Sequence, residues 1–242
     1  MKTRLRALLS TAAVAIAACG IAPRTETPIP VIASSDVRNS KTLIVMLPGR
    51  GDRASSFPDA DFLNQPHASD FDVVAVDAHF GYYMKRTLIP RLHDDVILPS
   101  LQAGYENIWL LGVSMGGLGA ILYAAEYPDN VTGLVLLAPY LGDPALASEV
   151  QASGGLANWN PDNSEFKQHE VDAWRWLQSS RLGSEPVPIL LGYGLEDRFA
   201  NNYRPLQHEI SGINIFTEVG GHNWTTWNKL WQVMQTDLAQ HN

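Results

Sequence analysis

The sequence predicts an α/β fold in which a mostly parallel central sheet carries helices on both faces. Along most of the 242 residues, short apolar runs of strand length alternate with segments whose apolar residues recur at helical spacing. The run from Ile108 to Val113 is apolar at nearly every position, as in strands that are buried on both faces of a parallel sheet. Hydrophobic residues make up 45% of the chain and charged residues 17%, so a single globular domain with a large core is expected.

The remaining elements follow from the same two periodicities and from the positions of proline and glycine. Strands are expected over residues 42–47, 71–76, 108–113, 131–138, 187–192 and 213–219, with residues 30–33 as a candidate edge strand. Helices are expected over residues 88–101, with an interruption or an end near Pro99, and after Ser114 as far as Pro128. A closing helix over residues 224–239 would place four large apolar side chains on one face, namely Trp227, Leu230, Trp231 and Met234.

Residues 141–186 interrupt the alternation of strands and helices. A structureless loop of this length is improbable inside a compact domain, so the segment should contain helices of its own. Asp162 and Glu165 have the spacing of a capping box, and apolar residues that include Trp174 follow at helical spacing. We interpret the segment as a small helical cap over the active-site end of the sheet. Ordinary packing of these helices against the domain is the alternative.

The first 18 residues have the organisation of an export signal rather than of a folded segment. Three basic residues precede an apolar run from Ala7 to Ala18 that is too short to span a bilayer as a mature helix. The following residues are rich in proline, serine and threonine, which is typical of a tether. The predicted organisation is therefore a signal peptide over residues 1–18, a tether over residues 19–40 and a folded domain over residues 41–242.

The end of the signal, Ile16-Ala17-Ala18-Cys19-Gly20, resembles the lipobox of bacterial lipoproteins, in which the cysteine becomes the lipidated N-terminus. Cys19 is the only cysteine of the chain, so it has no intramolecular disulfide partner. The alternative is ordinary cleavage after Ala17, which would leave a free thiol on an exported protein. The resemblance implies a cell-envelope lipoprotein whose acyl chains bind a membrane. Gly20 fits sorting to the outer membrane, with the domain facing the periplasm.

Composition and spacing also exclude some kinds of partner. The formal net charge is −8 and the sequence has no basic stripe, which argues against nucleic acid. Two groups of histidine and aspartate, one at residues 93–95 and one formed by Asp77 and His79, lack the spacing of a zinc site. No metal or organic cofactor is called for. The sequence does not define an oligomeric state.

The motif with the clearest chemistry is Gly112-Val-Ser114-Met-Gly116, which stands between a buried strand and a helix. A Gly-x-Ser-x-Gly sequence in this context predicts a nucleophile elbow, a sharp turn that exposes the serine hydroxyl. The glycines are needed because side chains two residues before and after the serine would collide across the turn. The turn also presents the N–H of Met115 at a helix N-terminus, where a developing oxyanion is favoured.

A serine hydroxyl is a poor nucleophile unless a base takes its proton and a third group orients that base. Two loops that follow expected strands offer these groups, Gly192-Tyr-Gly-Leu-Glu196-Asp197 and Gly220-Gly-His222. With these motifs, and with the stretch Tyr127 to Pro139, the chain resembles the serine α/β-hydrolases of the esterase and lipase group from about residue 41 to the C-terminus. The resemblance implies an α/β-hydrolase fold. It also implies that Ser114 is the nucleophile, His222 the general base and acid, and Asp197 the orienting acid, with Glu196 as the competing acid.

The same resemblance implies an oxyanion hole with two backbone donors. One is Met115, and the other is expected in the loop Leu47-Pro-Gly-Arg-Gly-Asp52, where relatives commonly have His-Gly. Arg50 follows Gly49, so its N–H is the candidate, although Pro48 replaces the usual histidine. The guanidinium of Arg50 could instead bind an anionic substrate. Five aromatic residues are candidates for the pocket walls or for ordinary packing: Tyr82, Tyr83, Tyr140, Trp159 and Trp224.

The sequence therefore predicts a serine hydrolase that cleaves carboxylic esters through an acyl-enzyme, with a small-molecule ester of undefined acyl length as substrate. Peptidases, thioesterases and acyltransferases use the same three residues and are alternatives. A non-catalytic envelope binding protein on the same scaffold is a hypothesis of a different class, because fold alone does not define function.

Overall fold

A computed structural model of the chain describes residues 23–34, 40–63, 71–180, 187–206, 209–210 and 212–238. The predicted signal peptide over residues 1–18 and the predicted lipidation site Cys19 lie outside these residues. Among the helices that the structure describes, none is both long and apolar enough to cross a membrane.

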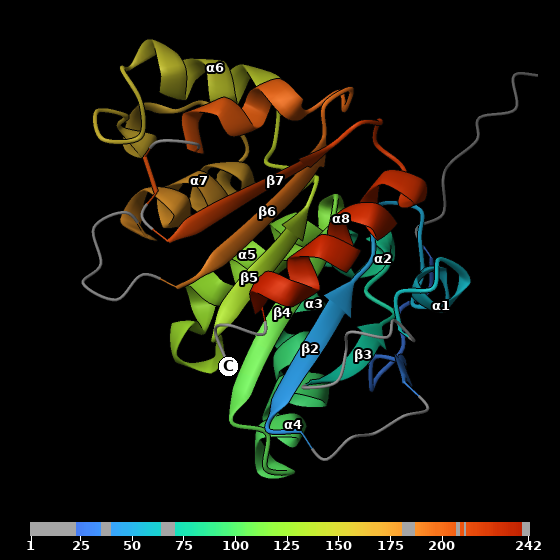
Figure 1. Cartoon of the computed structure of the whole chain (residues 1–242). Coiled ribbons are helices and arrows are strands. Elements are labelled where there is room, and N and C mark those ends of the chain that lie inside the picture. Colours follow the sequence, from blue (N-terminus) through green and yellow to red (C-terminus); the bar gives the residue numbers. More distant parts are fainter. Residues whose placement is uncertain are drawn as a thin grey trace, which may run out of the picture.

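Within the described residues, seven strands form one sheet in the order β1-β3-β2-β4-β5-β6-β7 (Figure 1). Strands β2 to β7 run parallel, and β1 pairs with β3 in the antiparallel sense at one edge. The predicted α/β class with a mostly parallel sheet is confirmed. The strands are β1 (Val31–Ala33), β2 (Thr42–Leu47), β3 (Asp72–Val76), β4 (Asn107–Val113), β5 (Gly133–Leu137), β6 (Ile189–Gly194) and β7 (Ile213–Glu218).

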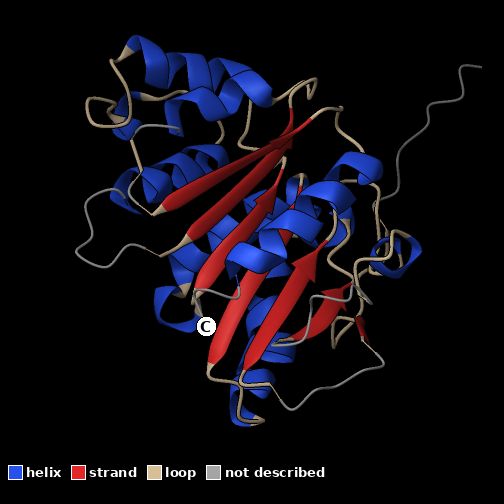
Figure 2. Cartoon of the chain, in the orientation of Figure 1, coloured by secondary structure: helices blue, strands red, loops and turns tan. Residues whose placement is uncertain are grey.

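Helices cover both faces of the sheet (Figures 1 and 2). The α-helices are α1 (Ser56–Asp59), α2 (Phe80–Met84), α3 (Leu88–Leu92), α4 (Leu98–Gln102), α5 (Met115–Glu126), α6 (Pro144–Ala152), α7 (Gln168–Ser180) and α8 (Trp224–Leu238). Side chains of α1 and α8 pack into one hydrophobic core with one face of the sheet. Side chains of α2, α3, α5, α6 and α7 pack into a second core on the opposite face.

The order of the strands places a topological switch point at the carboxyl ends of β2 and β4. Strands β2 and β4 are neighbours, but the chain leaves β2 toward β3 on one side and leaves β4 toward β5 on the other. Connections that diverge from adjacent parallel strands leave room between them, and ligands of open α/β sheets bind at this position. The residue after β4 is Ser114, and the loop after β2 contains Arg50.

The strands predicted from the apolar runs are confirmed, and their ends differ from the prediction by at most two residues. The candidate edge strand is β1. The face predicted for the closing helix is also confirmed, because Trp227, Leu230, Trp231 and Met234 of α8 are all buried. The centre of the sheet is shielded from solvent, since every residue of β2, β3 and β5 is buried. A strand that is buried on both faces needs no alternation of polar and apolar residues.

The helix predicted over residues 88–101 does not end at Pro99. The chain stays helical from Leu88 to Gln102, as α3, a π-helical turn η1 (His93–Ile97) and α4. Proline has no N–H to donate to the preceding turn, and Pro99 sits at the start of α4, where that donor is not required. The predicted interruption is therefore a π turn that precedes the proline.

The segment between β5 and β6 contains helices, but its predicted capping box is wrong. Residues 161–163 form a separate 3₁₀ turn, η3 (Pro161–Asn163), which is capped by Asn160, and α7 begins only at Gln168. Asp162 instead pairs with Arg175 of α7 at 3.0 Å. The helix α6 was not assigned from the sequence. Its N-terminus is capped by the Asp143 carboxylate, which accepts from Ala145 N at 2.9 Å.

The two helices of this segment have different neighbours. Helix α7 lies against α5 on one face of the sheet, which is the ordinary packing left open from the sequence. Helix α6 adjoins η4 (Ala200–Leu206), the 3₁₀ helix that follows Asp197. Helix α6 therefore reaches the neighbourhood of Asp197, and α7 reaches the candidate wall residue Tyr140 through Glu170.

Part of the predicted tether belongs to the folded domain. Ile29 is buried in the core, and its N–H donates to the Asp95 carboxylate at 2.9 Å. Closer to the N-terminus, the Tyr82 hydroxyl bonds to both the backbone N and the carbonyl O of Glu26. The boundary predicted at residue 41 therefore moves toward the N-terminus.

Candidate active site

Ser114 lies at the tip of the sharp turn between β4 and α5. Its backbone has a φ of 51° and a ψ of −112°, a conformation that L-residues rarely adopt. Three backbone hydrogen bonds hold it there: Ser114 N donates to Leu137 O at 2.9 Å, and Ser114 O accepts from Tyr140 N at 2.8 Å and Gly117 N at 3.0 Å. Strain of this kind persists only where the surroundings fix it, and it is concentrated at functional sites.

The two glycines of the motif are required by close backbone contacts. A Cβ atom on Gly112 would collide with the carbonyl group of Gly116, and a Cβ atom on Gly116 would collide with Leu47 O at the end of β2. The start of α5 is therefore in contact with both β4 and the first residues of the loop that follows β2. This is the steric reason that the sequence predicted for the pattern Gly-x-Ser-x-Gly.

The structure brings His222 and Asp197 to Ser114 in a linear chain of hydrogen bonds. His222 Nε2 lies 2.9 Å from Ser114 Oγ, and His222 Nδ1 lies 2.7 Å from Asp197 Oδ2. Because a carboxylate can only accept, Nδ1 holds the proton of a neutral ring and Nε2 is free to accept from the serine hydroxyl. The Asp197 side chain is fully buried, and the His222 side chain is 13% exposed.

Asp197, rather than Glu196, contacts the imidazole. The second Asp197 oxygen accepts from Phe199 N at 2.8 Å, so both carboxylate oxygens have defined partners. Glu196 is exposed, and its backbone N donates to Gly220 O at 2.9 Å. That bond joins the loop of the acid to the loop of the histidine, which fixes the two loops relative to each other.

Aromatic rings surround the imidazole. The rings of Phe199 and Trp227 both meet the His222 ring edge-on, with centroids at 5.2 Å and 4.9 Å. Tyr140 packs against Phe199 at 5.9 Å, and its hydroxyl donates to Glu170 Oε1 at 3.0 Å. Burial, with this bond to Glu170, raises the pKa of Tyr140 to about 12, so the phenol is neutral near pH 7. These rings form an apolar wall beside the base.

Three other aromatic candidates, Trp224, Tyr82 and Trp159, form hydrogen bonds with residues outside the chain of contacts from Asp197 to Ser114. Trp224, the first residue of α8, donates to Asp52 Oδ1 at 3.4 Å, a contact between the end of the histidine loop and the loop after β2. Tyr82 binds Glu26 of the N-terminal segment, and the indole of Trp159 donates to Glu149 of α6.

One predicted oxyanion donor, Met115, directly follows the serine, and the other, Arg50, follows a residue that lies close to it. Met115 is the first residue of α5, so its N–H has no acceptor within the helix. In the loop after β2, the Cβ position of Gly49 lies 3.5 Å from Ser114 Cβ, and Arg50 is the next residue. The guanidinium of Arg50 stacks over the Phe80 ring at 4.8 Å. Arg50 is exposed and forms no ion pair with any residue that the structure describes.

The short helix α2 contacts both sides of this arrangement. The ring of Phe80, the first residue of α2, stacks against the Arg50 guanidinium, and the Tyr83 hydroxyl donates to Met115 O at 3.0 Å. Burial raises the pKa of Tyr83 well above the ordinary value of a phenol, so the hydroxyl remains a donor. Helix α2 thus supports the first turn of α5 and the side chain of the loop residue opposite it.

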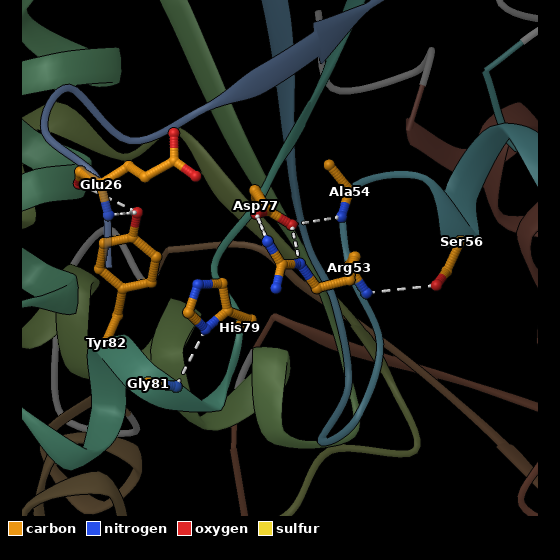
Figure 3. A network of polar contacts seen from close by, with 8 residues as sticks. All are labelled: Glu26, Arg53, Ala54, Ser56, Asp77, His79, Gly81 and Tyr82. Carbon is orange, nitrogen blue, oxygen red and sulfur yellow. Dashed lines mark hydrogen bonds and ion pairs between the residues drawn. The ribbon is translucent and has the colours of Figure 1, made fainter. Parts of the chain in front are cut away.

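A network of polar contacts joins the loop after β2 to the end of β3 beside α2 (Figure 3). Arg53 binds Asp77 through two parallel bonds, Nε to Oδ1 at 2.8 Å and a terminal nitrogen to Oδ2 at 2.6 Å. His79 caps α2, because its Nδ1 accepts from Gly81 N at 3.1 Å. Burial lowers the pKa of His79 below its ordinary value of 6.5, and the nearby charge of Arg53 lowers it further.

The groups that could be mistaken for metal ligands have other partners. His93 stacks on Tyr127 with centroids 4.0 Å apart and bonds to the Tyr123 hydroxyl. Asp94 and Asp95 both pair with Arg91. In the described part of the chain, no group of three or more histidine, cysteine, aspartate or glutamate side chains is arranged to hold a metal ion.

A groove of about 280 Å³ lies elsewhere on the molecule, at the edge of the sheet next to β1. Its lining includes Val31, Leu43, Val74 and Tyr105, and none of Ser114, Asp197 and His222. This groove is therefore separate from the candidate active site.

Sequence reasoning missed three residues of this region: Phe199, Tyr83 as a support of α5, and Arg53. Phe199 is two residues after Asp197, and this short spacing could have indicated that its ring lies beside the imidazole. The hydrogen bond of Tyr83 to Met115 spans 32 residues, and that of Arg53 to Asp77 spans 24. No local sequence pattern predicts pairs at such separations.

Comparison with known proteins connects this geometry to a family. A family model described as serine aminopeptidase, S33, matches residues 38–163, which is more than half of the chain. Among curated proteins, a 2-hydroxy-6-oxononadienedioate/2-hydroxy-6-oxononatrienedioate hydrolase of Comamonas testosteroni is 24% identical over 212 residues. That match covers 67% of this chain and 69% of the relative.

Solved structures share the architecture at low sequence identity. Est1E from Butyrivibrio proteoclasticus superposes with a TM-score of 0.60 and 14% identity, and the match covers 87% of this chain and 92% of Est1E. A monoacylglycerol lipase of Paleococcus ferrophilus gives a TM-score of 0.53 and 18% identity, with 88% and 99% covered. These likenesses confirm the predicted α/β-hydrolase fold.

The buried cap of α2 predicts a pH-dependent stability. The folded state lowers the pKa of His79, so the unfolded chain takes up a proton first as the pH falls. The contribution of a neutral His79 is fully present above about pH 6.5 and is lost below it. His79→Asn keeps a capping acceptor that cannot take up a proton. We expect this variant to have an unfolding free energy that changes less between pH 7 and pH 5 than that of the wild type, as measured by urea denaturation.

The matched control for this measurement is His169→Asn, because the His169 side chain is 51% exposed and its Nε2 lies 4.0 Å from Glu170 Oε1, too far for a hydrogen bond. This variant should keep the wild-type pH dependence. An unchanged slope in His79→Asn would show that the ring is not held neutral by its surroundings.

Proposed function

We propose that this chain, which belongs to the hydrolase family described as serine aminopeptidase, S33, cleaves carboxylic esters through a covalent acyl-enzyme. The observation behind the proposal is the chain of contacts from Asp197 through His222 to Ser114, at 2.7 Å and 2.9 Å. A hydroxyl, a base and an acid in this order are what nucleophilic catalysis by serine requires.

Acylation begins when Ser114 Oγ attacks the carbonyl carbon of the ester and its proton moves to His222 Nε2. Asp197 accepts from Nδ1 and stabilises the imidazolium that forms. The carbonyl oxygen becomes an oxyanion, and the N–H groups of Met115 and Arg50 are the proposed donors to it. Preorganised donors of this kind contribute strongly because they are aimed at charge that develops only in the transition state.

Collapse of the tetrahedral intermediate breaks the bond to the alcohol, which leaves with the proton from His222. The acyl group then remains on Ser114 as an ester. In deacylation a water molecule gives a proton to His222 Nε2 and attacks the acyl carbon. The acid leaves, and the proton returns to Ser114 Oγ. Throughout both halves, the edge-on rings of Phe199 and Trp227 restrict the imidazole to one orientation.

The identities of the solved neighbours support an ester rather than an amide as substrate. One is described as a monoacylglycerol lipase, and another structure of Est1E contains ferulic acid. The family description favours a second candidate, the removal of an N-terminal amino acid from a peptide. An aminopeptidase needs a carboxylate for the α-ammonium group of its substrate. The Glu170 carboxylate near the site is already bound by Tyr140 and Lys167.

The proposed location is based on the N-terminal sequence. We infer that residues 1–18 direct export and that Cys19 is lipidated, which would attach the domain to the outer membrane facing the periplasm. The expectation depends on the apolar run and on the single cysteine.

The first test of the function is labelling of Ser114. We expect a fluorophosphonate probe to form one covalent adduct on the wild-type chain and none on Ser114→Ala, with the modified residue located by peptide mass spectrometry. p-Nitrophenyl esters of graded acyl length, assayed beside alanine p-nitroanilide and a matched thioester, compare the candidate substrates. A non-catalytic binding protein would not be labelled, and turnover of the anilide alone would support the aminopeptidase.

The second test separates the two acids. Asp197→Asn keeps the shape of the side chain but favours the wrong tautomer of His222, so kcat should fall by about 10³–10⁴-fold. Glu196→Gln is the matched control, and its kcat should stay within about threefold of wild type because Glu196 is exposed. Steady-state hydrolysis of a p-nitrophenyl ester measures both. The opposite pattern would assign the role of the acid to Glu196.

The third test concerns the anchor. Intact mass spectrometry of the protein purified from a bacterial membrane should show a chain that begins at Cys19 and has the added mass of acyl groups. Cys19→Ser should remove that mass and release the domain from the membrane fraction. An unmodified chain that begins at Ala18 would contradict the proposal.

A further inference from the structure

We propose that Arg53 and Asp77 are a positioning pair that holds the loop after β2 against Ser114, so that the N–H of Arg50 points at the reacting oxygen. The inference rests on the proposed function, because it assigns the pair to the oxyanion hole. Neither residue contacts Ser114, so both would act through the backbone of the loop.

Asp77 devotes its carboxylate to the loop. Its Oδ1 accepts from Arg53 Nε at 2.8 Å and from Ala54 N at 3.1 Å, and its Oδ2 accepts from the Arg53 terminal nitrogen at 2.6 Å (Figure 3). The two bonds from Arg53 form the planar fork that fixes both distance and orientation. Asp77 itself is anchored in the fold, since it follows β3 directly and its N–H donates to Pro30 O at 2.8 Å.

The loop that is held in this way runs from Pro48 to Ala54, between the end of β2 and the fork. Its first residues contact the elbow, because the Cβ position of Gly49 lies 3.5 Å from Ser114 Cβ. Within the loop, Asp52 N donates to Gly49 O at 3.2 Å. The proposed donor Arg50 therefore lies between a contact with the nucleophile and a fixed end three residues later.

A third contact ties the same loop to the histidine side of the site. The Trp224 indole donates to Asp52 Oδ1 at 3.4 Å, and Trp224 is two residues after His222. The loop after β2 is thus held to the end of β3 through Asp77 and to the start of α8 through Trp224. Only the fork to Asp77 involves a buried charge, since its side chain is 9% exposed.

The pair is better placed to set geometry than to add stability. The Arg53 side chain is 47% exposed, and ion pairs open to solvent on one side contribute little to folding. An oxyanion donor, however, must lie about 2.7–3.1 Å from the oxygen of the transition state. A displacement of about 1 Å in a positioning element can lower a rate by about 10²-fold.

The test compares Asp77→Asn and Arg53→Gln with Asp95→Asn. Asp95 is a matched control: its side chain is 10% exposed, it pairs with Arg91, and it accepts a backbone N–H, that of Ile29. It lies in η1 and forms none of the described hydrogen bonds with the loop after β2. Its partner Ile29 precedes Pro30, and asparagine keeps an oxygen that can accept from Ile29 N. We expect both variants of the pair to lower kcat/KM for a p-nitrophenyl ester by about 10–100-fold, and Asp95→Asn to change it by less than about threefold.

A second readout distinguishes positioning from simple support of the fold. A trifluoromethyl ketone forms a tetrahedral adduct with the serine and places an oxyanion in the hole, whereas the corresponding alcohol product binds without one. In the variants of the pair, the inhibition constant of the ketone should rise by the same factor as kcat/KM falls, and that of the alcohol should not change. The double variant should lose no more than about threefold beyond either single variant, because the two residues act as a unit.

Arg53→Lys, which keeps the charge but not the fork, covers the case in which Asp77→Asn does not fold. It should lose less activity than Arg53→Gln, and circular dichroism below the melting temperature establishes that each variant is folded. Wild-type values of kcat/KM and ketone inhibition in folded variants of the pair would overturn the inference. So would equal losses in Asp95→Asn. A wild-type chain that neither hydrolyses the ester nor binds the ketone would instead overturn the proposed function, and the inference with it.

Discussion

The strained backbone of Ser114 is the constraint on which the other features of the site depend. Its φ of 51° is maintained by hydrogen bonds to Leu137 and Tyr140, so the sheet itself holds the turn in a conformation that the chain would otherwise leave. Because Gly116 has no side chain, the end of β2 can lie against the start of α5. A Cβ atom at this position would collide with Leu47 O. A serine held in this way needs no movement of its own backbone to reach His222.

Around this fixed point, three loops from separate strands are joined to one another. The loop after β2 contacts the start of α8, two residues after His222, through Asp52 and Trp224. The histidine loop contacts the acid loop through Gly220 O and Glu196 N. Each loop leaves the carboxyl end of a parallel strand, so the strand order brings together residues that are 108 positions apart in sequence, such as Ser114 and His222. The site is therefore stabilised by the same contacts that order its loops.

The sheet, the elbow and the three central residues were predictable because each has a local signal. An unbroken apolar run indicates a buried strand, and Gly-x-Ser-x-Gly is informative because sterics leave few other choices at its glycines. The prediction of a capping box at Asp162 was wrong because Asn160 caps a separate 3₁₀ turn, η3, that includes Asp162. The Asp162 side chain pairs with Arg175 instead. Asp77 stood visibly at the end of a strand, yet nothing local indicates which arginine it binds.

The N-terminal segment shows how far such distant contacts extend. Glu26 holds Tyr82 of α2, and the carbonyl of Pro30 holds the residue that fixes the loop after β2. Helix α2 in turn contacts Met115 through Tyr83 and the Arg50 side chain through Phe80. The segment that resembled a tether in composition thus supports the elements on both sides of the proposed oxyanion hole. Composition describes how a segment behaves alone, whereas its role here is set by backbone groups that any sequence possesses.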